Sequence, residues 1–117
     1  MRTMALATAL ATILVTTQVM ADTAFVDGFE DMPAMPGMTA IPDGSVSFDT
    51  ASGRIIVAFM RTTAYRHEIL AFYESALAEL GWRLRTDQRY VREGEVLSLD
   101  LTRDGSATIV RYSLKPE

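Results

Sequence analysis

The chain has no cysteine and only one histidine, His67, among its 117 residues. Without cysteine it forms no disulfide, no thiolate nucleophile and no thiolate metal site. A lone histidine rules out a histidine pair for a metal. The sequence also lacks a Gly-x-Ser-x-Gly elbow and a phosphate-binding glycine loop. These absences predict a protein that is not an enzyme and that folds by core packing alone.

Positive charge is also scarce, because 11 Lys and Arg face 15 Asp and Glu, which gives a net charge of −4. Nucleic acids and anionic lipid surfaces are bound through basic surfaces. Neither is therefore expected as a partner. No apolar run after residue 21 reaches the roughly 20 residues that a membrane-spanning helix needs. No membrane span is expected once that first segment is removed.

The first 21 residues have the build of a secretory signal peptide. Arg2 supplies a positive charge, residues 5–15 form an uncharged apolar run, and Ala21 ends a Val-Met-Ala sequence. This order matches the charged, apolar and small-residue regions of such peptides. We therefore expect cleavage after Ala21 and a mature protein in the periplasm.

Residues 22–42 predict an extended arm. They hold three of the four prolines, which fix φ and remove backbone donors, so neither a helix nor a central strand is expected. The charged residues of the arm are all acidic, and many apolar residues lie between them. So much apolar surface is unusual for a disordered segment. We expect part of the arm to lie across the folded body.

Residues 43–117 predict an α+β domain with one helix on a mostly antiparallel sheet of about five to six strands. The helix is expected over 65–80, with one apolar stripe, a cap at Thr62 or Thr63, and a left-handed end at Gly81. A type I′ turn is expected at Asp104–Gly105. Strands are predicted at 45–49, 54–62, 82–85, 89–92, 96–103 and 107–114.

The strand over 54–62 is apolar at consecutive positions, which is typical of a central strand covered on both faces. The single helix covers only one face of a sheet. The methionine-rich arm is one candidate for the cover of the second face, and a second copy of the chain is the other.

Several short motifs occur together: Asp31–Met38 (DMPAMPGM), Phe48–Asp49, Gly53–Ile55 and Phe72–Trp82 (FYESALAELGW). In this combination the chain resembles a group of small exported α-proteobacterial proteins with the pattern D-x-P-x-M-P-G-L, then F-D-x-x-x-G-R-I, then F-Y-x-x-x-L-x-x-L-G-W. The likeness covers most of residues 29–82, with Met38 in place of the leucine. It implies an envelope location and a one-helix α+β domain, and it implies no site.

Met32, Met35 and Met38 recur at a spacing of three. Thioethers are soft ligands that select Cu(I), and a polyproline II path would bring side chains three residues apart together. The simpler interpretation is that these flexible side chains fill gaps against the sheet. A periplasmic Cu(I)-binding protein is therefore the alternative function, with copper as its cofactor. The favoured interpretation needs no cofactor.

Arg83, Arg85, Arg89 and Arg92 form the second cluster. Guanidinium groups on one sheet face can bind a carboxylate or phosphate. They can instead pair with acidic residues across the strands, or hold the acidic arm. The candidate acidic partners are Glu93, Glu95 and Asp100 on the strands, and Asp22, Asp27, Glu30 and Asp31 on the arm.

We conclude from the sequence that the protein is a non-enzymatic periplasmic binding or interaction domain. Its partner is expected to be an envelope protein or a second copy of the chain. The predicted contact surface combines the arm with the second face of the sheet, through Phe29, Met35, Arg83 and Arg85.

Overall fold

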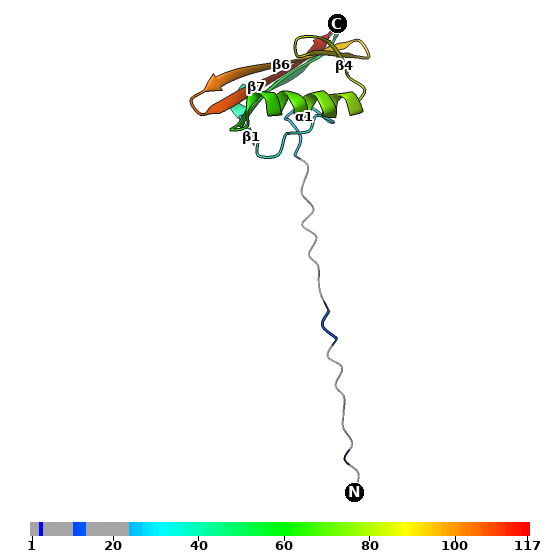
Figure 1. Ribbon diagram of the computed structural model, residues 1–117. Helices are drawn as coiled ribbons and strands as arrows, with labels where there is room; N and C mark the ends of the chain where they lie inside the picture. Colours follow the sequence, from blue (N-terminus) through cyan, green and yellow to red (C-terminus); the bar gives the residue numbers. More distant parts are fainter. Residues whose placement is uncertain (1–2, 4–10, 14–23) are drawn as a thin grey trace.

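A computed structural model describes residues 3, 11–13 and 24–117, so the predicted signal peptide, residues 1–21, lies almost entirely outside the described residues. One helix, α1 (Arg66–Glu79), packs on a seven-stranded antiparallel sheet (Figure 1). The α+β class is confirmed, with more strands than expected. The strands are β1 (Thr39–Ala40), β2 (Val46–Thr50), β3 (Gly53–Thr62), β4 (Arg83–Thr86), β5 (Arg89–Arg92), β6 (Glu95–Asp104) and β7 (Ala107–Pro116).

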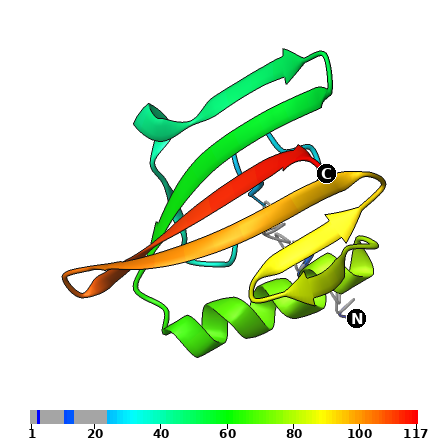
Figure 2. The ribbon, with the colours of Figure 1, turned by 90° about the horizontal axis from the view of Figure 1, so that it is seen from above.

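β3 lies in the sheet between the strands that precede it in the chain and the C-terminal strand β7. Its one edge pairs with β1 and β2, its other edge pairs with β7, and β6, β5 and β4 follow in that order (Figure 2). The central position predicted for residues 54–62 is therefore correct. The additional strand is β1, whose two residues are too few to give a periodic signal in the sequence.

The type I′ turn of the sheet lies at a different hairpin from the one that we expected. Glu93 and Gly94 join β5 to β6 with φ of 49° and 78°, and two positive φ values are the mark of a type I′ turn. Between β6 and β7 only Gly105 has a positive φ, 61°. The expected type I′ turn at Asp104–Gly105 is therefore wrong. A glycine alone at the first central position is typical of type II′.

The helix buries Ile69, Tyr73 and Leu77, at a spacing of four, against the sheet. The expected cap is wrong, because Tyr65 occupies the N-cap without a side-chain bond, whereas the Thr62 hydroxyl accepts a hydrogen bond from the Ala64 N–H at 3.1 Å. In the described part of the chain, no helix combines the length and the apolar character needed to cross a bilayer.

Gly81 ends the helix in the left-handed conformation, as predicted, with φ of 86°. Gly81→Ala is expected to lower the free energy of unfolding by about 1–2 kcal/mol in urea denaturation. The added methyl has room, since the nearest atom, Cδ of Arg92, lies 3.8 Å away, so the cost is backbone strain. Gly81→Asn is the matched variant and should lose less, because asparagine tolerates this conformation. Equal losses would contradict strain as the cause.

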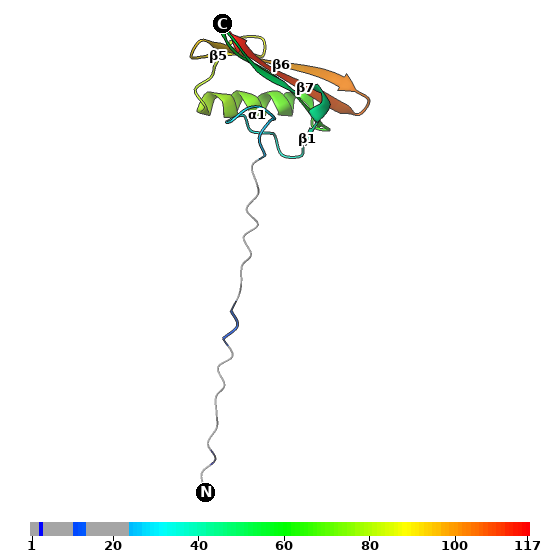
Figure 3. The same ribbon diagram turned by 180° about the vertical axis from the view of Figure 1, so that it is seen from behind.

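The arm supplies a large part of the core. Val26, Phe29 and Met32 are buried in the same cluster as the helix and the β3 side chains. A tight loop holds them there, with hydrogen bonds from Val26 N–H to the Met32 carbonyl at 2.9 Å and from Ala34 N–H to the Ala24 carbonyl at 2.8 Å. The expectation that the arm lies across the body is confirmed. Of the two candidate covers of the second face, the arm is excluded, because it shares the face with α1 (Figures 1 and 3).

Candidate functional site

Neither α1 nor the arm covers the second face of the sheet (Figures 1 and 2), where the turn at Pro42–Gly44 packs against Phe59. On β3 the side chains alternate, so that Ile56, Ala58 and Met60 are buried on the helix side and Ile55 and Val57 are half-buried on the other side. We call this second side the open face. It has an apolar half, formed by Val46, Phe48, Ile55 and Val57, and a polar half, formed by Arg85, Arg89, Ser98, Asp100, Arg111, Ser113, Lys115 and Glu117.

The apolar half is formed by the edge strand β2 and its neighbour β3. Val46 lies opposite Val57 and Phe48 opposite Ile55, and opposite residues share one face of a sheet. Val46 and Phe48 are 49% and 50% exposed. The alternation of polar and apolar residues over 45–49 also puts these two side chains on one face, and the register shows that this face is the open one.

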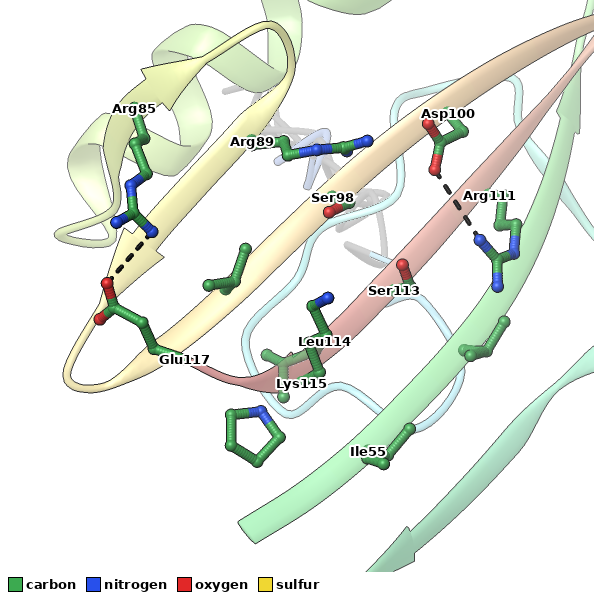
Figure 4. A pocket seen from close by; sticks show the side chains of 13 residues that line it. Ile55, Arg85, Arg89, Ser98, Asp100, Arg111, Ser113, Leu114, Lys115 and Glu117 are labelled. Atoms are coloured by element: carbon green, nitrogen blue, oxygen red, sulfur yellow. Dashed lines mark ion pairs between the residues drawn. The ribbon is translucent and has the colours of Figure 1, made fainter. Parts of the chain in front are cut away.

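The polar half surrounds a hollow of about 660 Å³ on β5, β6 and β7 (Figure 4). Arg85 pairs with Glu117 at 3.1 Å, and Arg111 lies 3.8 Å from Asp100. Ser98 is only 8% exposed and, with Ser113, lies between the charged side chains. The hollow thus combines two hydroxyls and a ring of charges with apolar side chains, among them Val57 and Val96.

The charge of the hollow is opposite to that of the whole chain. Four basic and two acidic side chains line it, whereas the chain carries a net charge of −4. Arg89 and Lys115 take part in none of the ion pairs formed among the described residues. The unneutralised positive charge of the hollow therefore lies at these two residues.

The predicted contact residues separate onto two sides of the sheet. Arg83 lies opposite Val91 and Arg85 lines the hollow, which places both arginines on the open face. Phe29 is buried, 6.4 Å from Tyr112 between ring centroids, and Met35 packs against the core beside it. Phe29 and Met35 belong to the covered side, so the arm and the second face do not form one surface.

Arg92 is the one member of the arginine cluster that holds the acidic arm. It donates to Asp31 Oδ2 and to the Leu80 carbonyl, both at 2.9 Å, and its guanidinium carbon lies 4.2 Å from the centroid of Trp82. The alternative in which the cluster pairs with Glu93, Glu95 or Asp100 is wrong, because the described residues form no such ion pair. Glu95 instead binds Arg54 with two hydrogen bonds, and this contact raises the pKa of Arg54.

The three methionines of the possible copper site occupy different environments. Met32 is completely buried in the core. The Met38 sulfur lies 3.3 Å from the Tyr112 hydroxyl oxygen and 3.5 Å from that of Tyr73, and Met35 is half-buried against the core. These contacts agree with thioethers that fill gaps in the core. Cu(I) binding by Met32, Met35 and Met38 stays a prediction.

A buried tyrosine pair was not predicted from the sequence. The Tyr73 and Tyr112 hydroxyls lie 2.6 Å apart, and Tyr73 donates to the Pro33 carbonyl at 2.9 Å. Burial raises the pKa of Tyr73 to about 12, and burial beside Tyr73 also raises the pKa of Tyr112. Their partners come from segments 35 to 74 residues away, which no local pattern encodes.

On the open face, exposed apolar side chains and cations that form no ion pair with another described residue therefore lie on neighbouring strands. Comparison with protein-family models, curated proteins and solved structures gives no match to this chain.

Proposed function

We propose that the protein is a non-enzymatic binding domain of the periplasm and that the open face is its binding surface. One observation supports this most strongly: β3 keeps the apolar side chains of Ile55 and Val57 on a face that neither α1 nor the arm covers. The uncovered face of an antiparallel sheet normally alternates to polar residues. An exposed apolar area bordered by polar groups is typical of an interaction site.

The location is inferred from the sequence. The signal-peptide pattern of residues 1–21 and the likeness to exported proteins both favour the periplasm. The absence of cysteine agrees with a binding role that needs no thiol chemistry.

Photo-crosslinking in the envelope fraction tests the proposal. A benzophenone amino acid at position 48, on the open face, is expected to form adducts with a bound molecule, which intact mass then identifies. The same group at position 65 is the matched control, because Tyr65 is 64% exposed but precedes α1 on the other side of the sheet. Val57→Asp should abolish the adducts from position 48, because it places a charge in the apolar half.

The adduct pattern decides between outcomes. Adducts from position 48 and none from position 65 support the open face, and a product of twice the chain mass identifies a second copy as the partner. Equal yields from both positions, or none from position 48, contradict the proposal.

A further inference from the structure

We infer that the open face binds a single-chain alkyl carboxylate, with the carboxylate at Arg89, Ser98 and Ser113 and the alkyl chain across Val57 and Val46. This inference deepens the proposed function and rests on it. It names the chemical class of the ligand and its orientation on the sheet.

The first step is the register of the strands. Arg89 lies opposite Ser98, Ser98 opposite Ser113, Ser113 opposite Val57, and Val57 opposite Val46. Five neighbouring strands therefore place one cation, two hydroxyls and two apolar side chains in a single row. At about 4.8 Å between strands, the row is roughly 19 Å long. Its polarity changes once along its length, as the polarity of an amphiphile does.

The second step is the charged end of the row. Arg89 extends over β6 beside Ser98 and forms no ion pair with another described residue, whereas Arg85 and Arg111 each face an acid (Figure 4). A guanidinium fork and two hydroxyl donors match the two oxygens of a planar carboxylate. Asp100 and Glu117 border the same hollow and would repel a polyanion or an anionic membrane surface. The site therefore favours a small ligand with one negative charge.

The third step is the apolar end. Val46, Phe48, Ile55 and Val57 offer no hydrogen-bonding side-chain groups. A peptide crossing these side chains would leave its backbone amides unpaired as they lose water, which costs free energy. An alkyl chain has no such groups and gains from burial. The hollow of about 660 Å³ also falls within the size range of small-molecule sites.

Titration of the protein purified from the envelope with decanoate, below its micelle concentration, tests the inference by calorimetry and amide chemical shifts. Saturable binding at one site is expected, with shifts at Ser98, Ser113 and Val57. Acetate, which has the head without the chain, and decyltrimethylammonium, which has the chain with a positive head, should bind at least about tenfold more weakly. Decyl phosphate carries the same alkyl chain with a phosphate head, and its affinity relative to that of decanoate tests whether the site prefers a carboxylate.

Two variants locate the two ends of the ligand. Arg89→Gln should weaken decanoate binding about tenfold or more and leave the weak binding of decyltrimethylammonium unchanged. Val46→Ser should weaken both alkyl ligands. Arg66→Gln makes the same charge change on the exposed side of α1 and should change neither affinity.

Equal affinity for decanoate and decyltrimethylammonium, an unchanged affinity in Arg89→Gln, or binding of decyl phosphate alone would each overturn the inference. Failure of this inference and failure of the proposed function remain distinct. If decanoate does not bind while position 48 still crosslinks to a protein, the ligand class is wrong and the binding face stands. If position 48 forms no adduct, the proposed function fails as well.

Discussion

Met32→Ala is expected to lower the free energy of unfolding by about 2–5 kcal/mol, although Met32 lies in the proline-rich arm. The side chain is fully buried among α1, the sheet and the rest of the arm. Its removal takes away buried apolar surface and leaves a cavity that the surrounding core fills only in part. Urea denaturation followed by Trp82 fluorescence measures the loss.

Two variants separate packing from other causes. Met32→Leu keeps the volume and should cost less than about 1.5 kcal/mol. Met35→Ala, three residues along the same arm, should cost less than Met32→Ala because Met35 is only half-buried. A wild-type urea midpoint for Met32→Ala would show that the arm is not part of the cooperative core.

The arm has a structural role that determines where the binding face lies. It packs beside α1, and Asp31 is held by Arg92 on the helix side of the sheet. One helix of 14 residues is too narrow to cover a seven-stranded sheet, so the arm completes the cover of that side. The helix and the arm both pack on the same side of the sheet. The apolar side chains of β2 and β3 therefore stay exposed on the other side.

Local patterns in the sequence predicted most of the elements. The helix, and the strands from β2 to β7, depend on apolar periodicity and on turn glycines, both of which act over a few residues. The end of α1 at Gly81 was predicted for the same reason, because its left-handed φ is a local requirement. β1 was missed because its pairing with Arg61 and Met60 comes entirely from the distant partner strand.

The side of the sheet on which a segment packs could not be predicted. Val46 and Phe48 alternate as a core-facing pair would, and only the register with β3 shows that they point to the open face. The sequence grouped four arginines as a possible cluster on one sheet face. Strand alternation and pairing then divide it, with Arg85 and Arg89 on the open face and Arg92 on the covered side. Cross-strand register therefore carries the information that the sequence patterns lack.

Alkaline pH is expected to destabilise the protein through the buried tyrosine pair. The folded-state pKa of Tyr73 is raised from 10.0 to about 12 by burial, and the pKa of Tyr112 is also raised. Below pH 10 both states keep the phenolic protons, so the stabilisation is fully present. Between pH 10 and about 12 the unfolded chain loses these protons and the folded protein keeps them. The free energy of unfolding should then fall by about 1.4 kcal/mol per pH unit for each of the two groups.

Urea midpoints measured from neutral pH to about pH 12 give this slope, and tyrosinate absorbance in the folded protein reports which phenols ionise. Tyr112→Phe should lower the stability at neutral pH, because it removes a hydroxyl that lies 2.6 Å from that of Tyr73. The same variant should reduce the alkaline slope by about 1.4 kcal/mol per pH unit, because it deletes one buried phenol while Tyr73 and Tyr90, whose pKa values are also raised by burial, remain. Tyr65→Phe removes an exposed hydroxyl and should leave the slope unchanged. An alkaline slope that Tyr112→Phe does not reduce would show that other groups cause the loss, since the phenol that this variant deletes would then contribute nothing.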